Sequence, residues 1–181
     1  MKKRVLYTVI VLLFPALAWI SCKKLDKLTH FNMDYSMDIT LPANSIIDLP
    51  LEALSPEIET NSDAAFNGNS THRDLVESIR LETMTFTILS PPEQNFDFMR
   101  SVEIFISAEG LEELKVAARY EVPDGLGQYM ELETFGTELR DYLKKDRIRL
   151  KVRTVTDKPL PADTDIRIHT VFFVDAEILG Q

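Results

Sequence analysis

The sequence contains a single cysteine, Cys22, among its 181 residues. Exported domains commonly pair their cysteines in disulfides, and clusters of thiolates bind zinc. One thiol can form neither, so an internal disulfide framework and a multi-cysteine metal site are both excluded. The same count excludes a cysteine nucleophile anywhere after residue 22.

Histidine is also scarce, and His30, His72 and His169 lie far apart along the chain. The sequence has no nucleophile elbow, P-loop, dinucleotide-binding glycine motif or H-E-x-x-H motif. Asp163, Asp165 and His169 could supply oxygen and nitrogen ligands to a metal, but a loop followed by a strand often carries such residues by chance. We expect no cofactor and no metal, and catalysis by carboxylates alone stays open.

The sequence has fewer basic than acidic residues: 20 Lys and Arg against 29 Asp and Glu, which gives a net charge of −9. Three of the cations are Lys2, Lys3 and Arg4, so the chain after residue 21 has a net charge of −12. Nucleic acids and anionic lipids repel so acidic a chain. We therefore expect no nucleic-acid partner and interpret the acidity as a contribution to solubility.

The first 22 residues hold the one long hydrophobic run. Residues 5–20 carry no charge, follow the cationic start and end at Ser21 and Cys22. A membrane-spanning helix needs roughly 20 apolar residues. A charged start, a shorter apolar run and a small residue at its end are typical of a secretory signal. Sixteen uncharged residues interrupted by Pro15 favour the secretory signal.

Residues 18–22 resemble a bacterial lipobox, although Trp19 stands where that family prefers leucine. The resemblance implies that residues 1–21 are a lipoprotein signal peptide and that the thiol of Cys22 carries an acyl chain such as palmitate. Two or more acyl chains on the mature start give stable membrane attachment. Residues 22–30 would then form a short tether. The alternatives are an ordinary secretion signal with an incidental cysteine and an uncleaved N-terminal anchor.

The residue after the cysteine indicates which membrane holds such a protein. In lipoproteins of didermal bacteria, aspartate at that place causes retention at the inner membrane, whereas this chain has Lys23. Surface-exported lipoproteins of Bacteroidetes-like bacteria often carry an acidic run there, and KKLDK has a single acid. We expect an outer-membrane lipoprotein that faces the periplasm, with the cell surface as the alternative.

The rest of the chain has the pattern of short strands separated by turns. In residues 31–41, apolar and polar residues alternate without a break, which predicts a strand with one buried face. A change of apolar phase near Glu82 and Thr83 predicts a bulge in the strand at 78–89. Further expected elements are strands at 45–49, 101–107, 114–122, 128–135, 147–155 and 164–176, a helical turn starting at Ser70 or Thr71, and a helix over 137–145 capped by Thr137.

Seven or eight short strands with one or two short helices indicate an all-β protein. We predict a single antiparallel β-sandwich domain, immunoglobulin-like, over residues 31–181. Stretches such as NFDFMRSVEIFISAEGL and DIRIHTVFFVDAEI, together with the lipobox, resemble small lipoproteins of unknown activity from Bacteroidetes. That resemblance implies no activity.

One basic segment stands out against the acidic background. In RIRLKVR, four cations alternate with apolar residues, and a hairpin to the next strand would place two further basic side chains beside them. In that register residue 153 faces 167 and residue 151 faces 169. The predicted surface for an anionic partner consists of Arg147, Arg149, Lys151, Arg153, Arg167 and His169.

Two interpretations of this surface are open. Acids from a third strand, such as Glu103 or the pair Glu131 and Glu133, would neutralise it, or an anionic glycan, headgroup or protein would bind it. The chain as a whole then has two candidate functions. One is a non-catalytic binding or adaptor module tethered in the cell envelope, with an envelope protein or glycan as partner. The other is a periplasmic hydrolase that uses carboxylates or a metal.

Overall fold

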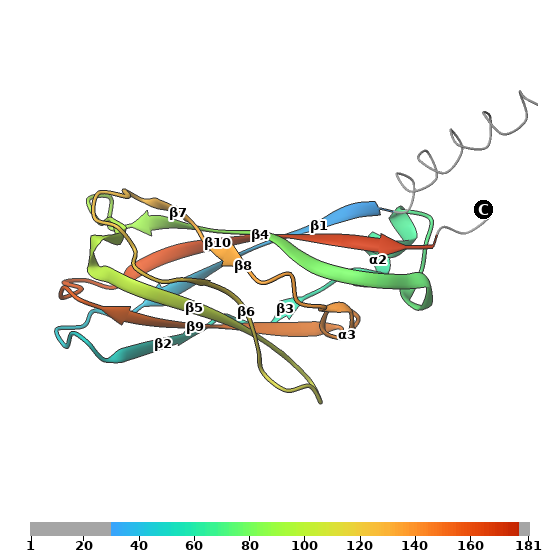
Figure 1. The fold of residues 1–181 in the computed structure, drawn as a ribbon, viewed down its shortest axis with the longest axis horizontal. Coiled ribbons are helices and arrows are strands. Elements are labelled where there is room, and N and C mark those ends of the chain that lie inside the picture. The colour runs from blue at the N-terminus through green and yellow to red at the C-terminus, as the bar shows by residue number, and fades with distance from the viewer. Residues whose placement is uncertain (1–29, 178–181) are drawn as a thin grey trace, which may run out of the picture.

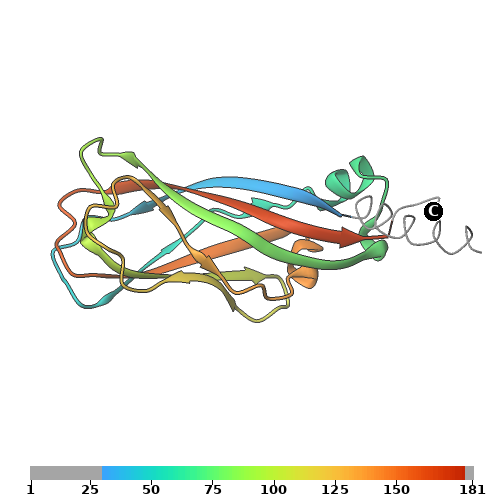
Figure 2. The ribbon, with the colours of Figure 1, turned by 45° about the horizontal axis from the view of Figure 1, so that its top comes forward.

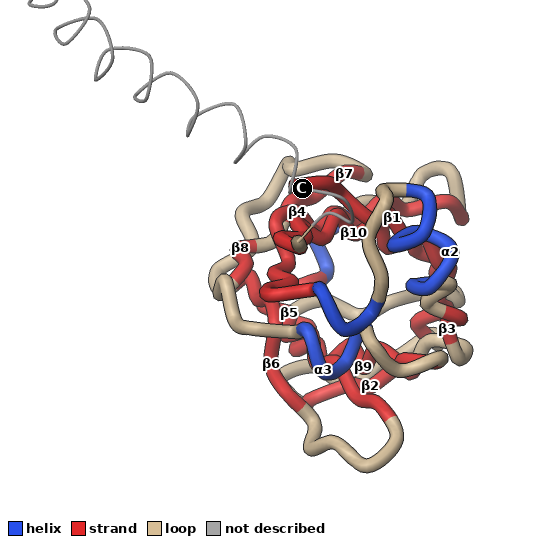
Figure 3. The backbone as a smooth tube through the Cα atoms, turned by 90° about the vertical axis from the view of Figure 1, so that its right-hand side faces the viewer, coloured by secondary structure: helices blue, strands red, loops and turns tan. Residues whose placement is uncertain are grey.

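The computed structural model describes residues 30–177, which form two antiparallel sheets packed face to face (Figure 3). The all-β sandwich predicted from the sequence is confirmed. The signal peptide over 1–21, the acylated Cys22 and the tether up to residue 29 lie outside the described residues. His30, assigned to the tether, is the first residue of a strand.

One sheet has four strands in the order β1-β10-β4-β7 (Figure 1). These strands are β1 (His30–Leu41), β10 (Thr164–Ala176), β4 (Val76–Ser90) and β7 (Tyr129–Glu131). The second sheet has the order β2-β9-β5-β6-β8, and β3 also pairs with β9. Its strands are β2 (Pro50–Leu54), β3 (Ile58–Glu59), β5 (Met99–Ala108), β6 (Leu114–Arg119), β8 (Glu133–Thr134) and β9 (Arg147–Thr156).

The connectivity is that of a jelly roll. The first strand, β1, lies beside the last, β10. The chain passes from one sheet to the other on each side of β4 and β7, as well as between β1 and β2 and between β9 and β10. In an immunoglobulin domain the first strand pairs instead with the second. The likeness to immunoglobulins therefore extends to the two-layer sandwich and does not extend to the order of the strands.

The alternation in residues 31–41 produces the buried face that it predicts. Met33, Ile39 and Leu41 lie in the core, while the polar residues between them face solvent. The predicted bulge in β4 is also confirmed, because Thr83 pairs with Val171 and Leu81 with Phe172. Glu82 is left between these two pairs, and the extra residue turns both apolar phases of β4 toward the core.

Several local predictions differ from the structure. Residues 45–49 form a loop, and the strand predicted there lies further along, at β2. The helical turn expected from Ser70 or Thr71 is a 3₁₀ turn, Arg73–Leu75, capped by the His72 side chain. Helix α3 is only Arg140–Leu143 and has no side-chain cap from Thr137. The single strand expected over 128–135 is divided into β7 and β8. A further 3₁₀ turn, Phe96–Phe98, precedes β5.

Helix α2 (Ser62–Gly68) was not predicted at all. It has no long apolar stripe, and its contact with the core is made mainly by Phe66, with the small side chain of Ala65 beside it. Phe66 is fully buried and meets the ring of Phe31 edge-on, with 6.3 Å between the ring centroids. One buried aromatic residue in a polar stretch gives no periodic signal, so only the tertiary structure shows this helix.

The two ends of the sandwich differ, as Figures 1 and 2 show. At the terminal end, β1 begins and β10 ends, and helices α2 and α3 lie there. At the loop end, four connections meet: 42–49, 91–98, 120–128 and 157–163. Since β10 has 13 residues, the ends are separated by about 40 Å at roughly 3.3 Å per residue.

Candidate functional site

The predicted basic surface is divided between the two sheets. Strand β9 pairs with β2, β3 and β5, whereas β10 pairs with β1 and β4. The hairpin register of 153 with 167 and 151 with 169 is therefore wrong, and the six basic residues form no common patch. Arg147, Arg149, Lys151 and Arg153 face outward from one sheet, and Arg167 and His169 face outward from the other. The chain between β9 and β10 crosses from one sheet to the other, so it cannot close a hairpin.

Arg153 lies between two carboxylates and an aromatic ring. Its Nε donates to Glu52 Oε1 at 2.8 Å, and its Nη1 is 3.9 Å from Glu103 Oε2. Its guanidinium lies 4.9 Å from the centroid of the Phe105 ring, a cation–π contact. The hydrogen bond from Arg153 lowers the pKa of the Glu52 carboxyl. The positive charge is thus neutralised within the sheet.

The other three cations of β9 have acidic partners as well. Lys151 donates to Glu113. Arg147 and Arg149 both donate to Glu57, at 3.3 Å and 3.0 Å, from the start of the strand. Because intramolecular acids neutralise the whole row, the face offers little free positive charge to an anionic partner.

Only one of the acids proposed to offset this charge does so. Glu103 lies on β5, beside β9, and also accepts a hydrogen bond from Lys115 that lowers its pKa. Glu131 belongs to β7 in the other sheet, and Glu133 lies on the edge strand β8. The acids that neutralise most of the row come from β2 and from two loops, whose positions local sequence does not indicate.

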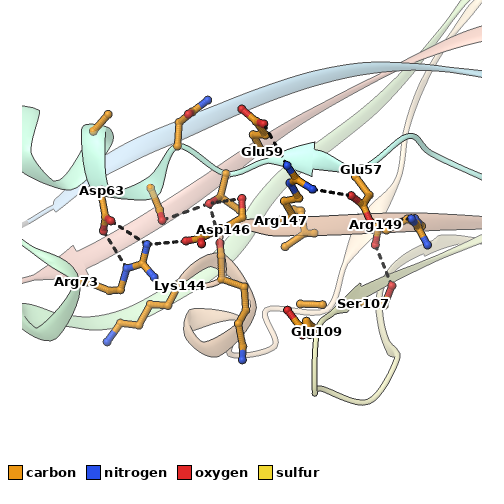
Figure 4. Close-up of a pocket in the computed structure, with 17 residues that line it drawn as sticks. Glu57, Glu59, Asp63, Arg73, Ser107, Glu109, Lys144, Asp146, Arg147 and Arg149 are labelled. Carbon is orange, nitrogen blue, oxygen red and sulfur yellow. Dashed lines mark hydrogen bonds and ion pairs between the residues drawn. The ribbon is translucent and has the colours of Figure 1, made fainter.

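A polar cleft of about 1040 Å³ opens at the terminal end, beside the start of β9 (Figure 4). Arg73 spans one side of it and donates to Asp63 at 2.9 and 3.0 Å and to Asp146 at 3.2 Å. Arg147 and Arg149 line the opposite side. Five basic and five acidic side chains line the cleft, so its formal charges cancel. The basic residues are Arg73, Lys144, Lys145, Arg147 and Arg149, and the acidic residues are Glu57, Glu59, Asp63, Glu109 and Asp146.

The carboxyl groups that have a shifted pKa in the described residues are not suited to donate a proton near neutral pH. A general acid needs a pKa raised toward the working pH. In residues 30–177 every resolved carboxyl shift is downward, and the groups concerned are Asp38, Glu52, Glu103, Glu138 and Asp165. None of these five lines the cleft.

Arg167 and His169 have partners of their own on the four-stranded sheet. Arg167 donates from Nε and Nη2 to the two carboxylate oxygens of Asp38, at 2.8 and 2.9 Å. His169 Nδ1 lies 3.0 Å from the hydroxyl of Ser36. Both partners belong to β1, directly opposite on the neighbouring strand.

The three residues considered as metal ligands are engaged separately. Asp163 accepts from the backbone N–H of Ala43 at 2.7 Å. Asp165 accepts from the hydroxyls of Thr40 and Ser90, both at 2.7 Å. Within residues 30–177 no group of three or more His, Cys, Asp or Glu side chains is arranged to hold a metal ion.

The loop end carries exposed apolar side chains that the sequence interpretation missed. Among residues 30–177, eight large hydrophobic residues are exposed, and six of them lie near this end: Ile46, Ile47, Leu49, Leu89, Tyr120 and Tyr129. Ile46, Ile47 and Leu49 come from the single loop between Pro42 and Pro50, where the adjacent isoleucines suggested a strand. Prolines at both ends of a short apolar segment were the available signal for a loop.

The loop over residues 42–49 is held firmly against β9 and its neighbours. Asn44 and Leu160 exchange backbone hydrogen bonds at 2.9 and 2.7 Å, and the N–H of Asp48 donates to Thr156 at 2.8 Å. Arg100 forms an ion pair with Asp48. These bonds fix the loop, so its isoleucines remain in solvent instead of folding back onto the core.

Within the described residues, none of the helices has both the length and the apolar character needed to cross a bilayer. No protein-family profile matches the sequence. No curated protein matches it either.

Several solved structures align with most of this chain, all at low scores. CpGH89CBM32-5 of Clostridium perfringens, in complex with GalNAc-beta-1,3-galactose, aligns with a TM-score of 0.37 at 10% identity over 80% of this chain and 97% of that one. The enzyme N-glycanase F (PNGase F) aligns at 0.39 and 10% identity over 80% and 42%. Tomato aspermy virus protein aligns at 0.35 and 11% identity over 83% and 80%. These scores are too low to carry an argument about function.

Proposed function

We propose that the protein is a bacterial outer-membrane lipoprotein, acylated on Cys22, that acts as a non-catalytic binding module in the cell envelope. Its partner would be another envelope protein, held at the loop end. The observation that carries the proposal is the cluster of three exposed apolar side chains, Ile46, Ile47 and Leu49, on the loop 42–49 at the end farthest from the start of β1.

The position of the loop end fits a tethered module. Eight residues from Lys23 to His30 reach at most roughly 27 Å when extended. Acyl chains on Cys22 would keep the terminal end close to the membrane, and the loop end would then project away from it by the length of the sandwich. Exposed apolar groups at that end would meet a partner across the periplasm without contacting the lipid.

The chemistry of the loop 42–49 favours a protein as the partner. Aliphatic side chains form no hydrogen bonds, so they match an apolar protein surface better than the hydroxyls of a polymer. Ile46, Ile47 and Leu49 are presented on a fixed backbone, which reduces the entropy lost on binding. Exposed apolar groups clustered on one part of a protein often mark such contacts.

The hydrolase alternative receives less support. A carboxylate-based enzyme needs a proton donor and a base that converge in a pocket. In the cleft, Glu57, Asp63 and Asp146 are all largely exposed and already paired with arginine. A binding role requires no such poised group.

The anchor is tested by metabolic labelling with radioactive palmitate in the native host. We expect label on the wild-type protein, no label on Cys22→Ser, and loss of the variant from the membrane fraction. Labelled Cys22→Ser, or an unlabelled wild type, would remove the lipoprotein part of the proposal.

The binding part is tested with a photo-crosslinking amino acid placed in the full chain. Ile46 is 59% exposed at the loop end, and Leu54 is 61% exposed near the other end of β2, so the two positions are matched. We expect one discrete protein adduct from position 46 and none from position 54. Equal adducts from both positions, or none from 46, would contradict a partner at the loop end.

A further inference from the structure

The outer face of the four-stranded sheet has two rows of polar side chains that cross all four strands. Asp38 on β1, Arg167 on β10, Thr87 on β4 and Tyr129 on β7 pair in register and form the first row. Neighbouring strands lie about 4.8 Å apart, so this row spans about 14 Å. It lies in the half of the sheet near the loop end.

The second row runs beside the first, two residues further along each strand. It consists of Ser36, His169, Thr85 and Glu131, again in register across the sheet. Thr85 is buried, so the second row presents the Ser36 hydroxyl, the His169 imidazole and the Glu131 carboxylate beside the first row. These groups add hydrogen-bond donors and acceptors to those of the first row.

Tyr129 supplies an apolar platform at one end of the first row. Tyr129 is 56% exposed. Leu89 is also exposed, two residues after the Thr87 that faces Tyr129. An exposed aromatic ring offers a flat apolar surface with a negative π-face, which attracts polarised C–H groups.

The ion pair at the other end of the first row is fixed and balanced in charge. Arg167 and Asp38 are joined by two parallel hydrogen bonds, and each side chain is 49% exposed. Arg167 has five N–H donors and uses two of them for Asp38, so it keeps donors for a ligand. A donor and an acceptor side by side match two adjacent hydroxyls, each of which donates and accepts.

We propose that this face binds an uncharged glycan. One sugar ring would stack its C–H face on Tyr129, with Leu89 beside it. The adjacent hydroxyls of a neighbouring sugar would bond to Arg167 and Asp38, with Thr87 between the two contacts. The ligand is uncharged because Asp38 neutralises Arg167 and because a chain with a net charge of −9 repels acidic polymers.

This inference concerns a different surface from the loop 42–49 and depends on neither the acyl anchor nor the protein partner. Its test is affinity electrophoresis of the detergent-solubilised full chain in native gels. The gels contain one of four neutral polysaccharides: soluble starch, dextran, xyloglucan or galactomannan. A gel with hyaluronan provides the anionic comparison. We expect retardation by at least one neutral polymer and none by hyaluronan.

Two substitutions locate the site. Tyr129→Ala removes the platform and Arg167→Ala removes the donors, and each should weaken binding about tenfold. Tyr129→Phe keeps the ring and should still bind. The matched control is Tyr120→Ala, because Tyr120 is 55% exposed but follows β6 of the other sheet. Its substitution should leave the retardation unchanged.

The alternative outcomes are equally definite. Absence of retardation in all four neutral gels would overturn the proposal. Retardation by hyaluronan alone would also overturn it. The same conclusion would follow if Tyr129→Ala and Tyr120→Ala reduced the retardation equally. If the circular dichroism spectra of the variants match that of the wild type, a loss of binding is due to the changed site and not to unfolding.

Discussion

The hydroxyl of Tyr35 donates a hydrogen bond to the backbone carbonyl of Thr60. Tyr35 belongs to β1 in the four-stranded sheet, and Thr60 directly follows β3, which pairs with the other sheet. The bond therefore joins the two layers at one of their edges. Burial raises the pKa of the Tyr35 hydroxyl, so the group stays protonated and can donate at any physiological pH.

Tyr35→Phe should lower the free energy of unfolding by about 1 kcal/mol, because a hydrogen-bond donor is removed and the carbonyl of Thr60 loses a partner. Urea denaturation followed by circular dichroism measures this change. The control is Tyr142→Phe, whose hydroxyl donates to Glu112 at an exposed site. If both substitutions lowered the free energy of unfolding equally, the bond between the layers would contribute no more to stability than an exposed hydrogen bond.

Phe66→Ala should be far more damaging. Phe66 is fully buried, and truncating a buried phenylalanine typically costs about 3–5 kcal/mol through lost contacts and the cavity left behind. The comparison is Phe135→Ala, because the Phe135 side chain is 42% exposed and its loss should change stability little. If the two variants unfolded at the same urea concentration, the docking of α2 onto the core would be contradicted.

Glu138 should make stability depend on pH. Burial raises the pKa of this carboxyl, but hydrogen bonds from the N–H of Ile79, the hydroxyl of Ser78 and the N–H of Arg140 outweigh burial and lower it. Because the folded pKa is below the unfolded one, the charged carboxylate stabilises the fold above the unfolded value of about 4.5. That stability is lost as the pH falls through the folded pKa.

Glu138→Gln should accordingly destabilise the protein at pH 7, by less than about 1 kcal/mol because solvent screens the site. The difference from wild type should shrink as the pH falls below about 4, which thermal unfolding at a series of pH values would measure. The control is Glu133→Gln, at an exposed position on the edge strand β8, which should change stability little at pH 7. A deficit for Glu138→Gln that is constant with pH would refute the role of the charge.

Arg153→Glu tests whether the basic row of β9 is neutralised internally. The substitution places a third carboxylate beside Glu52 and Glu103, so the melting temperature should fall. Adding Glu52→Arg restores an opposite-charge pair and should recover part of the loss. If Arg153→Glu leaves the melting temperature unchanged, the ion pairs contribute nothing and the arginine is free to bind a partner.

Local sequence predicted the elements that rest on local periodicity. Strand β1 follows from eleven alternating residues, and the bulge at Glu82 follows from a change of phase within one strand. The predicted faces of β9 are also correct, since Ile148, Leu150 and Val152 are buried and their basic neighbours point outward. Each of these depends on side chains alternating between the faces of a strand.

The candidate site was harder to predict, because its composition depends on which strands become neighbours. The hairpin joining Arg153 to Arg167 was a reasonable expectation for consecutive strands, which often pair. In the structure these strands lie in different sheets, and the acids beside β9 come from residues as distant as Glu52 and Glu113. Pairs so far apart in the chain leave no periodic trace.

The all-β class and the inward and outward faces of the long strands could be predicted from the chain alone. These properties follow from the order of apolar and polar residues over a few positions. Only the folded structure shows the jelly-roll order of the strands and the exposed apolar loop end. The same holds for the ion pairs that neutralise β9 and for the Arg167–Asp38 pair. The reason is that every strand with a buried face can pair with several others, and the choice is made by closing one common core.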